Sequence, residues 1–341
     1  MKAGVKQLLQ FIVFFGLGIG LTYWQFSGLD QEQKNYFFYA LRTANYFWVV
    51  LAIIIGALAH WSRATRWKML LTPLGHKTSF GNRFYSVMIG YLANYGIPRS
   101  GEVIRCTTLK TNEDVPFGES FGTVIVERLV DTFCLLLVFV IVLLMEFSQL
   151  SKLWKKFISD PAAVKFGHIM EHETLLFVLI AGAFLFLFLL FAFGKKLKTF
   201  FRNKFSLVWE GFKNGFSTIK RLPNPGLFIF HSLFIWSCYY FSTYVCFFAF
   251  KDASDYTLHT ALIVLLFGTF GVIFTPGGIG AYQIIVTNVL FELYKQSPLA
   301  NSTAHVAAPY SWLSWGAQVG TVVIFTGVAF ALRKTTKHKT T

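Results

Sequence analysis

The sequence predicts an all-α, polytopic membrane protein that forms a single membrane domain over residues 1–341. Hydrophobic residues make up 55% of the chain and charged residues only 14%, whereas average soluble domains carry about 25% charged residues. A spanning helix needs roughly 20 apolar residues. Uncharged runs of that length cover 7–29, 43–62, 174–194, 222–250, 256–291 and 296–332. These runs exclude a soluble protein.

Six full spans are predicted near 5–25, 45–62, 124–146, 174–194, 228–250 and 308–332. The first follows Lys2 and Lys6, as a signal peptide would. Its apolar core is long and no A-x-A cleavage site follows it, so we expect a retained span.

Two further apolar segments have the wrong length for a simple crossing. Residues 84–98 are too few for a full span, and residues 256–291 are too many for one span and too few for two. Each contains a Gly/Pro break, which membranes tolerate only where protein or a wet cavity surrounds the exposed backbone. We therefore expect two re-entrant hairpins, with backbone breaks formed by Asn94, Pro98, Gly101, Pro276, Gly277, Gly278 and Gly280.

The distribution of basic residues predicts the topology. With the N-terminus inside, 23 of the 31 Lys and Arg residues fall in inside segments, which favours a cell-membrane protein with both termini cytoplasmic. The order span, span, hairpin, span then occurs in 1–150 and again in 174–332. An outer connecting loop (151–173) separates the halves, and a basic tail (333–341) ends the chain. This order indicates an inverted repeat, as in many transporters; the alternative is that two breaks coincide by chance.

Residues 195–221 are not a predicted span. Apolar residues recur there every three or four positions among Lys and Arg residues, with Glu210 as the one acid. The pattern predicts an amphipathic helix at an anionic lipid surface, or a cytoplasmic helix packed on the bundle.

The first hairpin leads into a charged segment with Arg99, Glu102 and Arg105. A helix that starts here points free N–H groups and its positive dipole end toward mid-membrane, where a phosphate could bind. Both arginines could add charge-assisted hydrogen bonds. The alternative is that Glu102 and Arg105, three residues apart, form a structural ion pair.

The next span begins with Glu127, Arg128 and Asp131, which carry a formal −1. Charges near hydrocarbon usually face a bundle interior or a wet cavity. These side chains could balance Arg99 or Arg105 across a helix interface, or contact a headgroup amine or a proton. In the second hairpin Gln283 is the candidate hydrogen-bonding group.

Several chemistries find no support. The net charge of +15 does not indicate nucleic-acid binding, because the basic residues lie between apolar runs. His168, Glu171 and His172 fit a metallopeptidase pattern but have no further ligand cluster. The four cysteines form no CxxC pair. We expect no catalytic residues, no metal and no cofactor.

The stretches Asn94 to Arg105 (NYGIPRSGEVIR), Gly122 to Asp131 (GTVIVERLVD) and Thr275 to Gly280 (TPGGIG) resemble the lysylphosphatidylglycerol synthase transmembrane family, also described as flippase-like. The resemblance implies a membrane module that moves a lipid between leaflets. The best-known members add a cytosolic synthase domain, for which this chain has no room. The cargo is not implied.

The leading hypothesis is therefore a translocator of a phospholipid or a lipid-linked phosphate, with anionic phospholipid or polyprenyl phosphate as partners and possible homo-oligomers. An integral membrane enzyme acting on a lipid phosphate, with Glu127 or Asp131 as base, is one alternative. A transporter of small solutes or ions is the other.

Overall fold

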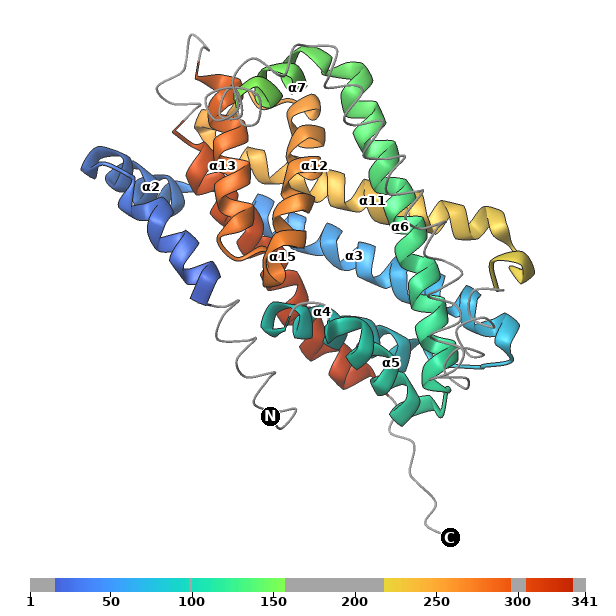
Figure 1. The fold of residues 1–341 in the computed structure, drawn as a ribbon. Helices are drawn as coiled ribbons and strands as arrows, with labels where there is room; N and C mark the ends of the chain where they lie inside the picture. The colour runs from blue at the N-terminus through green and yellow to red at the C-terminus, as the bar shows by residue number, and fades with distance from the viewer. Residues whose placement is uncertain (1–15, 98–99, 157–217, 296–304, 334–341) are drawn as a thin grey trace, which may run out of the picture.

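The computed structural model describes residues 16–97, 100–156, 218–295 and 305–333. Within these ranges every regular element is helical, so the predicted fold class is confirmed (Figure 1). Residues 16–27 are helical. The further α-helices are α2 (Gln31–Thr43), α3 (Tyr46–Leu71), α4 (Phe80–Gly96), α5 (Ser100–Glu113), α6 (Phe117–Met145), α7 (Phe147–Trp154), α11 (Pro225–Val245), α12 (Leu258–Phe274), α13 (Ala281–Tyr294) and α15 (Ala307–Leu332). Short 3-10 turns are η1 (Thr72–Leu74), η3 (Thr218–Arg221), η4 (Cys246–Ala249), η5 (Lys251–Ala253) and η6 (Pro276–Gly278).

Four of the described helical segments are long and apolar enough to cross a membrane: Tyr46–Leu74, Phe117–Met145, Pro225–Ala249 and Ala307–Leu332. They correspond to four predicted spans. The span at 5–25 is described only from residue 16. The span at 174–194, nearly all of the amphipathic helix at 195–221 and most of the loop at 151–173 lie outside the described residues. The count of six spans and the inverted repeat stay predictions.

Side-chain caps explain where several helices begin. Asp30 and Gln33 form a capping box at the start of α2, and Thr257 and Thr260 form another at α12. Asn45 accepts a hydrogen bond from the backbone of α3. Such caps satisfy N–H groups that have no partner inside the helix.

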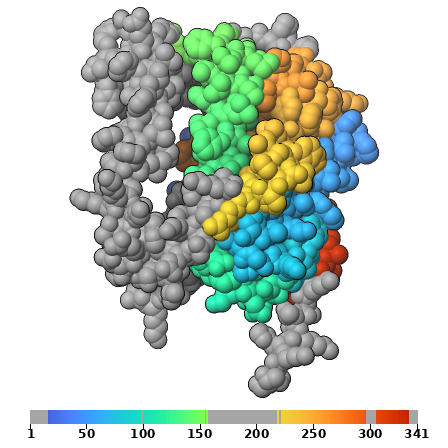
Figure 2. All heavy atoms as spheres, turned by 90° about the vertical axis from the view of Figure 1, so that its right-hand side faces the viewer, coloured from blue at the N-terminus to red at the C-terminus, as the bar shows by residue number. Residues whose placement is uncertain are grey.

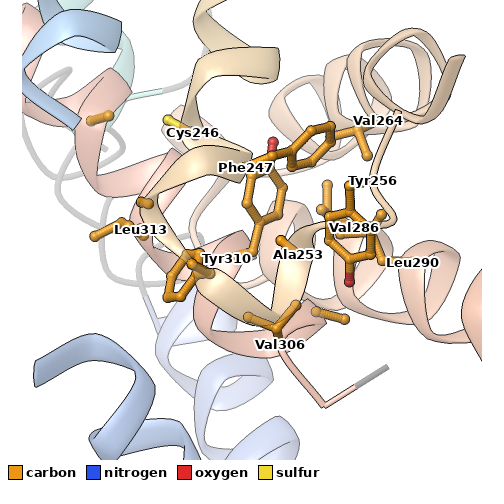
Figure 3. Packing of buried hydrophobic residues seen from close by; sticks show 14 of the residues in the cluster. Cys246, Phe247, Ala253, Tyr256, Val264, Val286, Leu290, Val306, Tyr310 and Leu313 are labelled. Carbon is orange, nitrogen blue, oxygen red and sulfur yellow. The ribbon is translucent and has the colours of Figure 1, made fainter. Parts of the chain in front are cut away.

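The helices of the two predicted hairpins are shorter than the four long apolar segments, and whether they are re-entrant stays a prediction. α4 and α12 have 17 residues each, and α5 and α13 have 14 each. Each pair packs together, α4 against α5 and α12 against α13, and α15 contacts both α4 and α13 (Figure 1). The second pair contributes Val264, Val286 and Leu290 to the apolar core in Figure 3. The same core contains Phe247 of η4 and Tyr310 of α15, whose rings lie 4.7 Å apart.

α3, α6 and α11 pack against one another beside the first hairpin. Figure 2 shows α11 on the surface between α3 and α6. α3 continues to Leu71, well beyond the predicted end at 62. Arg63 and Arg66, just beyond the predicted end, are buried residues of this long helix. The extended part of α3 carries two arginines of the candidate functional site.

Candidate functional site

Seven ionised side chains from three helices meet in one cluster, called the arginine cluster below. α3 contributes Arg63 and Arg66, α5 contributes Glu102 and Arg105, and α6 contributes Glu127, Arg128 and Asp131. Five of the seven are buried, with Arg66 0% and Glu127 1% exposed. Buried charges of this kind must be paired, because an isolated charge in low dielectric is strongly unfavourable.

Asp131 is held between two arginines of α3. Arg63 Nη1 donates to one carboxylate oxygen at 2.6 Å, and Arg66 Nη2 donates to the other at 2.9 Å. Arg63 and Arg66 are three residues apart and therefore lie on one face of α3. Arg66 also donates to Ser232 and Arg63 to Tyr239, which are both on α11.

Glu127 pairs with Arg105 across the α5–α6 interface. Arg105 Nη1 lies 2.6 Å from Glu127 Oε2, and Arg66 Nε lies 3.7 Å from the other oxygen. The Arg105 guanidinium also lies over the ring of Trp67, 3.7 Å from its centroid, an arrangement that stabilises a desolvated cation. Of the alternatives that the sequence left open for the α6 acids, the structure shows this pairing with Arg105 across a helix interface.

Glu102 pairs with Arg128 instead of Arg105. Arg128 Nη2 lies 2.8 Å from Glu102 Oε1, and its Nη1 lies 4.0 Å from Asp131. The local Glu102–Arg105 pair, which the sequence offered as an alternative, is not the pairing observed, because both residues reach across to α6. The side chain of Arg128 is 41% exposed, so this pair forms the accessible edge of the cluster.

The cluster carries surplus positive charge. Four arginines face three carboxylates, a formal +1 among the described residues. The predicted −1 counted only the α6 residues and missed both α3 arginines. Within the described ranges, Nε of Arg63, Nε of Arg66, and both Nε and Nη2 of Arg105 have no hydrogen-bond acceptor. Both carboxylate oxygens of Glu127 and Oε2 of Glu102 likewise have no hydrogen-bond donor there, so it is the surplus positive charge that favours an additional anion.

The two helices of the first hairpin are held together by close backbone contact and by the side-chain amide of Asn94. Gly101 N donates to Asn94 Oδ1 at 2.8 Å, so Asn94 caps the first turn of α5. A Cβ added to Gly101 would overlap the carbonyl oxygen of Gly90. The first turn of α5 is therefore partly satisfied from within the chain, and Glu102 adds a negative charge at its positive end. Pro98 and Arg99 lie outside the described residues.

The second hairpin turns through Pro276, Gly277 and Gly278, and α13 begins after Gly280, as predicted. Gly277, Gly278 and Gly280 have positive φ values of 59°, 81° and 77°, a region that favours glycine. The tips of the hairpins touch, because a Cβ on Gly277 would overlap the ring of Tyr95, in the last turn of α4. Trp315 of α15 donates to the Gly277 carbonyl at 2.8 Å.

Gln283 lies in the first turn of α13 and is 0% exposed. Neither its amide oxygen nor its amide nitrogen has a hydrogen-bond partner in the part of the chain that the structure describes. It is thus buried with unused hydrogen-bonding capacity, but it is not part of the arginine cluster.

Sequence reasoning missed Arg63 and Arg66. A signal was present, since HWSRATRW places two arginines three residues apart directly after an apolar run. The uncharged run ended there, and the helix was expected to end with it. His168, Glu171 and His172 lie outside the described residues, and all four cysteines are buried and free.

The family described as the lysylphosphatidylglycerol synthase TM region matches residues 7–309. The chain belongs to this family. A UPF0104 membrane protein of Methanocaldococcus jannaschii is 34% identical over 110 residues, which cover 31% of this chain and 31% of that protein. The aligned part thus spans about a third of the relative's length. No solved structure matches the chain.

Family membership confirms the resemblance based on the hairpin and α6 stretches. The protein is a multi-pass membrane protein of the lysylphosphatidylglycerol synthase TM region family. The matched range contains both hairpins and every residue of the arginine cluster, so the site lies within the part that defines the family.

Proposed function

We propose that this protein is a flippase-like lipid translocator, which moves a phospholipid or a lipid-linked phosphate headgroup between leaflets. The observation that carries the proposal is the arginine cluster, with its formal +1 and unused guanidinium N–H groups inside a membrane bundle. A phosphate would supply the missing negative charge and the missing acceptors, since arginine binds phosphate oxygens in a planar, bidentate manner.

The position of the cluster supports the same function. It lies against the first hairpin, whose tip contacts the tip of the second. Paired interrupted segments mark the substrate site in many transporters. In this proposal the headgroup moves past the hairpins while the acyl chains remain in lipid, and both termini are cytoplasmic.

The geometry argues against a lipid-phosphate hydrolase with Glu127 or Asp131 as the base. Glu127 is paired with Arg105, and Asp131 accepts hydrogen bonds from both Arg63 and Arg66. Both carboxylates therefore already face arginine partners. These pairs favour a binding role.

Reconstitution tests the proposal directly. The full chain is inserted into vesicles with trace acyl-labelled phosphatidylglycerol, phosphatidylcholine or polyprenyl phosphate, and a membrane-impermeant quencher reports the outer-leaflet fraction. We expect the phosphate-bearing anionic lipids to exchange between leaflets faster than in protein-free vesicles. An exchange rate equal to that of protein-free vesicles for every lipid would contradict the proposal, and uptake of small solutes instead would favour the solute-transporter alternative.

A matched pair of variants tests the role of the cluster. Arg128→Gln removes the surplus charge at the accessible edge and leaves Asp131 with both α3 arginines. Arg42→Gln makes the same chemical change on an exposed residue at the end of α2. We expect Arg128→Gln to slow exchange about tenfold, the effect of about 1.4 kcal/mol, and Arg42→Gln to leave it unchanged. Equal rates in the two variants would show that the cluster is structural.

A further inference from the structure

A second polar group lies on the other hairpin and contains no ionised side chain. We call it the neutral polar seam. It consists of Gln25 from the helical residues 16–27, Tyr282, Gln283 and Thr287 of α13, and Ser311 and Ser314 of α15. α13 and α15 pack directly against each other (Figure 1).

Hydrogen bonds connect most of the seam. Gln25 Nε2 donates to Thr287 Oγ1 at 3.1 Å, and Thr287 lies 2.9 Å from the Ser311 hydroxyl. Gln283 is four residues before Thr287, so their side chains share one face of α13. The segment from Leu258 to Phe291 contains no Asp, Glu, Lys or Arg, and neither does α15. The seam is therefore polar but uncharged.

Helix association alone accounts for only part of the seam. Small hydroxyl residues commonly hold membrane helices together, and this explains the paired atoms of Thr287 and Ser311. It does not explain Gln283, whose amide oxygen and nitrogen both lack partners among the described residues, nor Gln25, whose Oε1 is also without a donor. A buried polar atom left without a hydrogen bond costs about 1–3 kcal/mol.

The unused atoms indicate what the seam would bind. The Gln283 amide offers one acceptor and donors, and Gln25 Oε1 offers a further acceptor. A ligand group that matches both must donate and accept hydrogen bonds. It must also carry no charge, because the described residues of the seam include no charged side chain. Hydroxyl groups meet these conditions, whereas a phosphate monoester or an ammonium group does not.

We propose that the neutral polar seam binds the hydroxyl-bearing part of a lipid headgroup, while the arginine cluster binds its phosphate. This inference rests on the proposed function and adds the headgroup class. The contact between Tyr95 and Gly277 joins the tips of the two hairpins that carry these sites, so the phosphate site and the hydroxyl site lie on elements that touch.

The test compares anionic phospholipids whose headgroups carry hydroxyls with one whose headgroup is the phosphate alone. The full chain in phosphatidylcholine nanodiscs is titrated with phosphatidylglycerol, phosphatidylinositol or phosphatidic acid. At each lipid concentration the unfolding temperature is measured with a dye that reacts with cysteines exposed on unfolding. We expect roughly three- to tenfold tighter binding of the two hydroxyl-bearing lipids than of phosphatidic acid, as one or two neutral hydrogen bonds would give. Equal binding of all three lipids would overturn the inference.

Gln283→Leu removes the amide with little change in volume. We expect the lipid-free protein to be as stable as wild type or more so, because the substitution removes a buried amide without partners. The preference for hydroxyl-bearing lipids should disappear while binding of phosphatidic acid remains. Asn288→Leu is the matched control, because Asn288 is an exposed amide on the same helix that bonds only to the backbone carbonyl of Ile284. It should keep the preference.

Two further outcomes would overturn the inference. One is a Gln283→Leu or Gln283→Met protein that keeps the preference, which would give the amide a structural role. The other is soluble glycerol phosphate that gives the same shift as phosphatidylglycerol, which would make the ligand a solute. If the proposed translocator function itself is wrong, the result is different, because no phosphate-bearing lipid would then bind or exchange between leaflets.

Discussion

The Arg105–Glu127 ion pair can be measured with a double-mutant cycle. Its atoms lie 2.6 Å apart, and both side chains are almost completely buried. At an effective dielectric constant of about 20, an ion pair at this distance is worth about 6 kcal/mol of Coulomb energy, most of which offsets the desolvation of the two charges. Arg105→Gln leaves Glu127 with Arg66 Nε at 3.7 Å as its remaining ionic partner.

Each single substitution, Arg105→Gln or Glu127→Gln, should lower the free energy of unfolding by about 3–5 kcal/mol, because it leaves a buried charge without its partner. The double variant should lose less free energy of unfolding than the two single variants lose together. The difference, which is the coupling energy of the pair, should be about 2 kcal/mol or more. The cluster keeps its formal +1 in that variant, so the fold is expected to survive.

The four buried cysteines provide the assay. Cys106, Cys134, Cys238 and Cys246 are all free and buried, so a thiol-reactive dye reports unfolding in detergent or nanodiscs. The pair Glu102–Arg128 is the comparison, since its side chains are 22% and 41% exposed and Arg128→Gln should cost only about 1 kcal/mol. This account of the cluster would be refuted if the stability lost by the double variant equalled the sum of the losses of the two single variants. It would also be refuted if the free energy of unfolding of Arg105→Gln lay within about 1 kcal/mol of the wild-type value.

The hairpins supply three further predictions, all measured by the same thiol assay. Gly101→Ala should destabilise the protein by about 1–3 kcal/mol, because the added Cβ meets the carbonyl oxygen of Gly90. If the unfolding midpoint of this variant equals that of the wild type, α4 and α5 do not pack this closely. Gly277→Ala combines a positive φ with overlap against Tyr95, and adding Tyr95→Ala should restore part of the loss but not the roughly 1 kcal/mol of backbone strain. If Tyr95→Ala restored all of the stability lost in Gly277→Ala, or none of it, the loss would not be divided between backbone strain and overlap with the Tyr95 ring. Asn94→Ala removes the hydrogen bond to Gly101 N and should cost about 1 kcal/mol, and a variant as stable as wild type would show that the cap is unimportant.

The sequence by itself determined the class of the protein and the outline of its fold. Long apolar runs require backbone groups to be satisfied within helices, so four spans could be predicted from hydropathy alone. The break between α4 and α5 and the one at Pro276–Gly280 were also predictable, because glycine and proline act locally, although Gly101 itself lies inside α5. The charged residues of α5 and α6 were visible for a similar reason, since charge in an apolar segment requires a partner.

Only the tertiary structure decided which charges pair with which. Glu102 and Arg105 are close in sequence, yet each pairs with a residue of α6. Arg63 and Arg66 lie at the end of an uncharged run, where sequence indicates a loop, but packing against α6 and α11 keeps them helical and buried. Ion pairing depends on distance through space and on desolvation, which local sequence does not encode. The sign of the cluster, on which the proposed binding of an anion rests, follows from that packing.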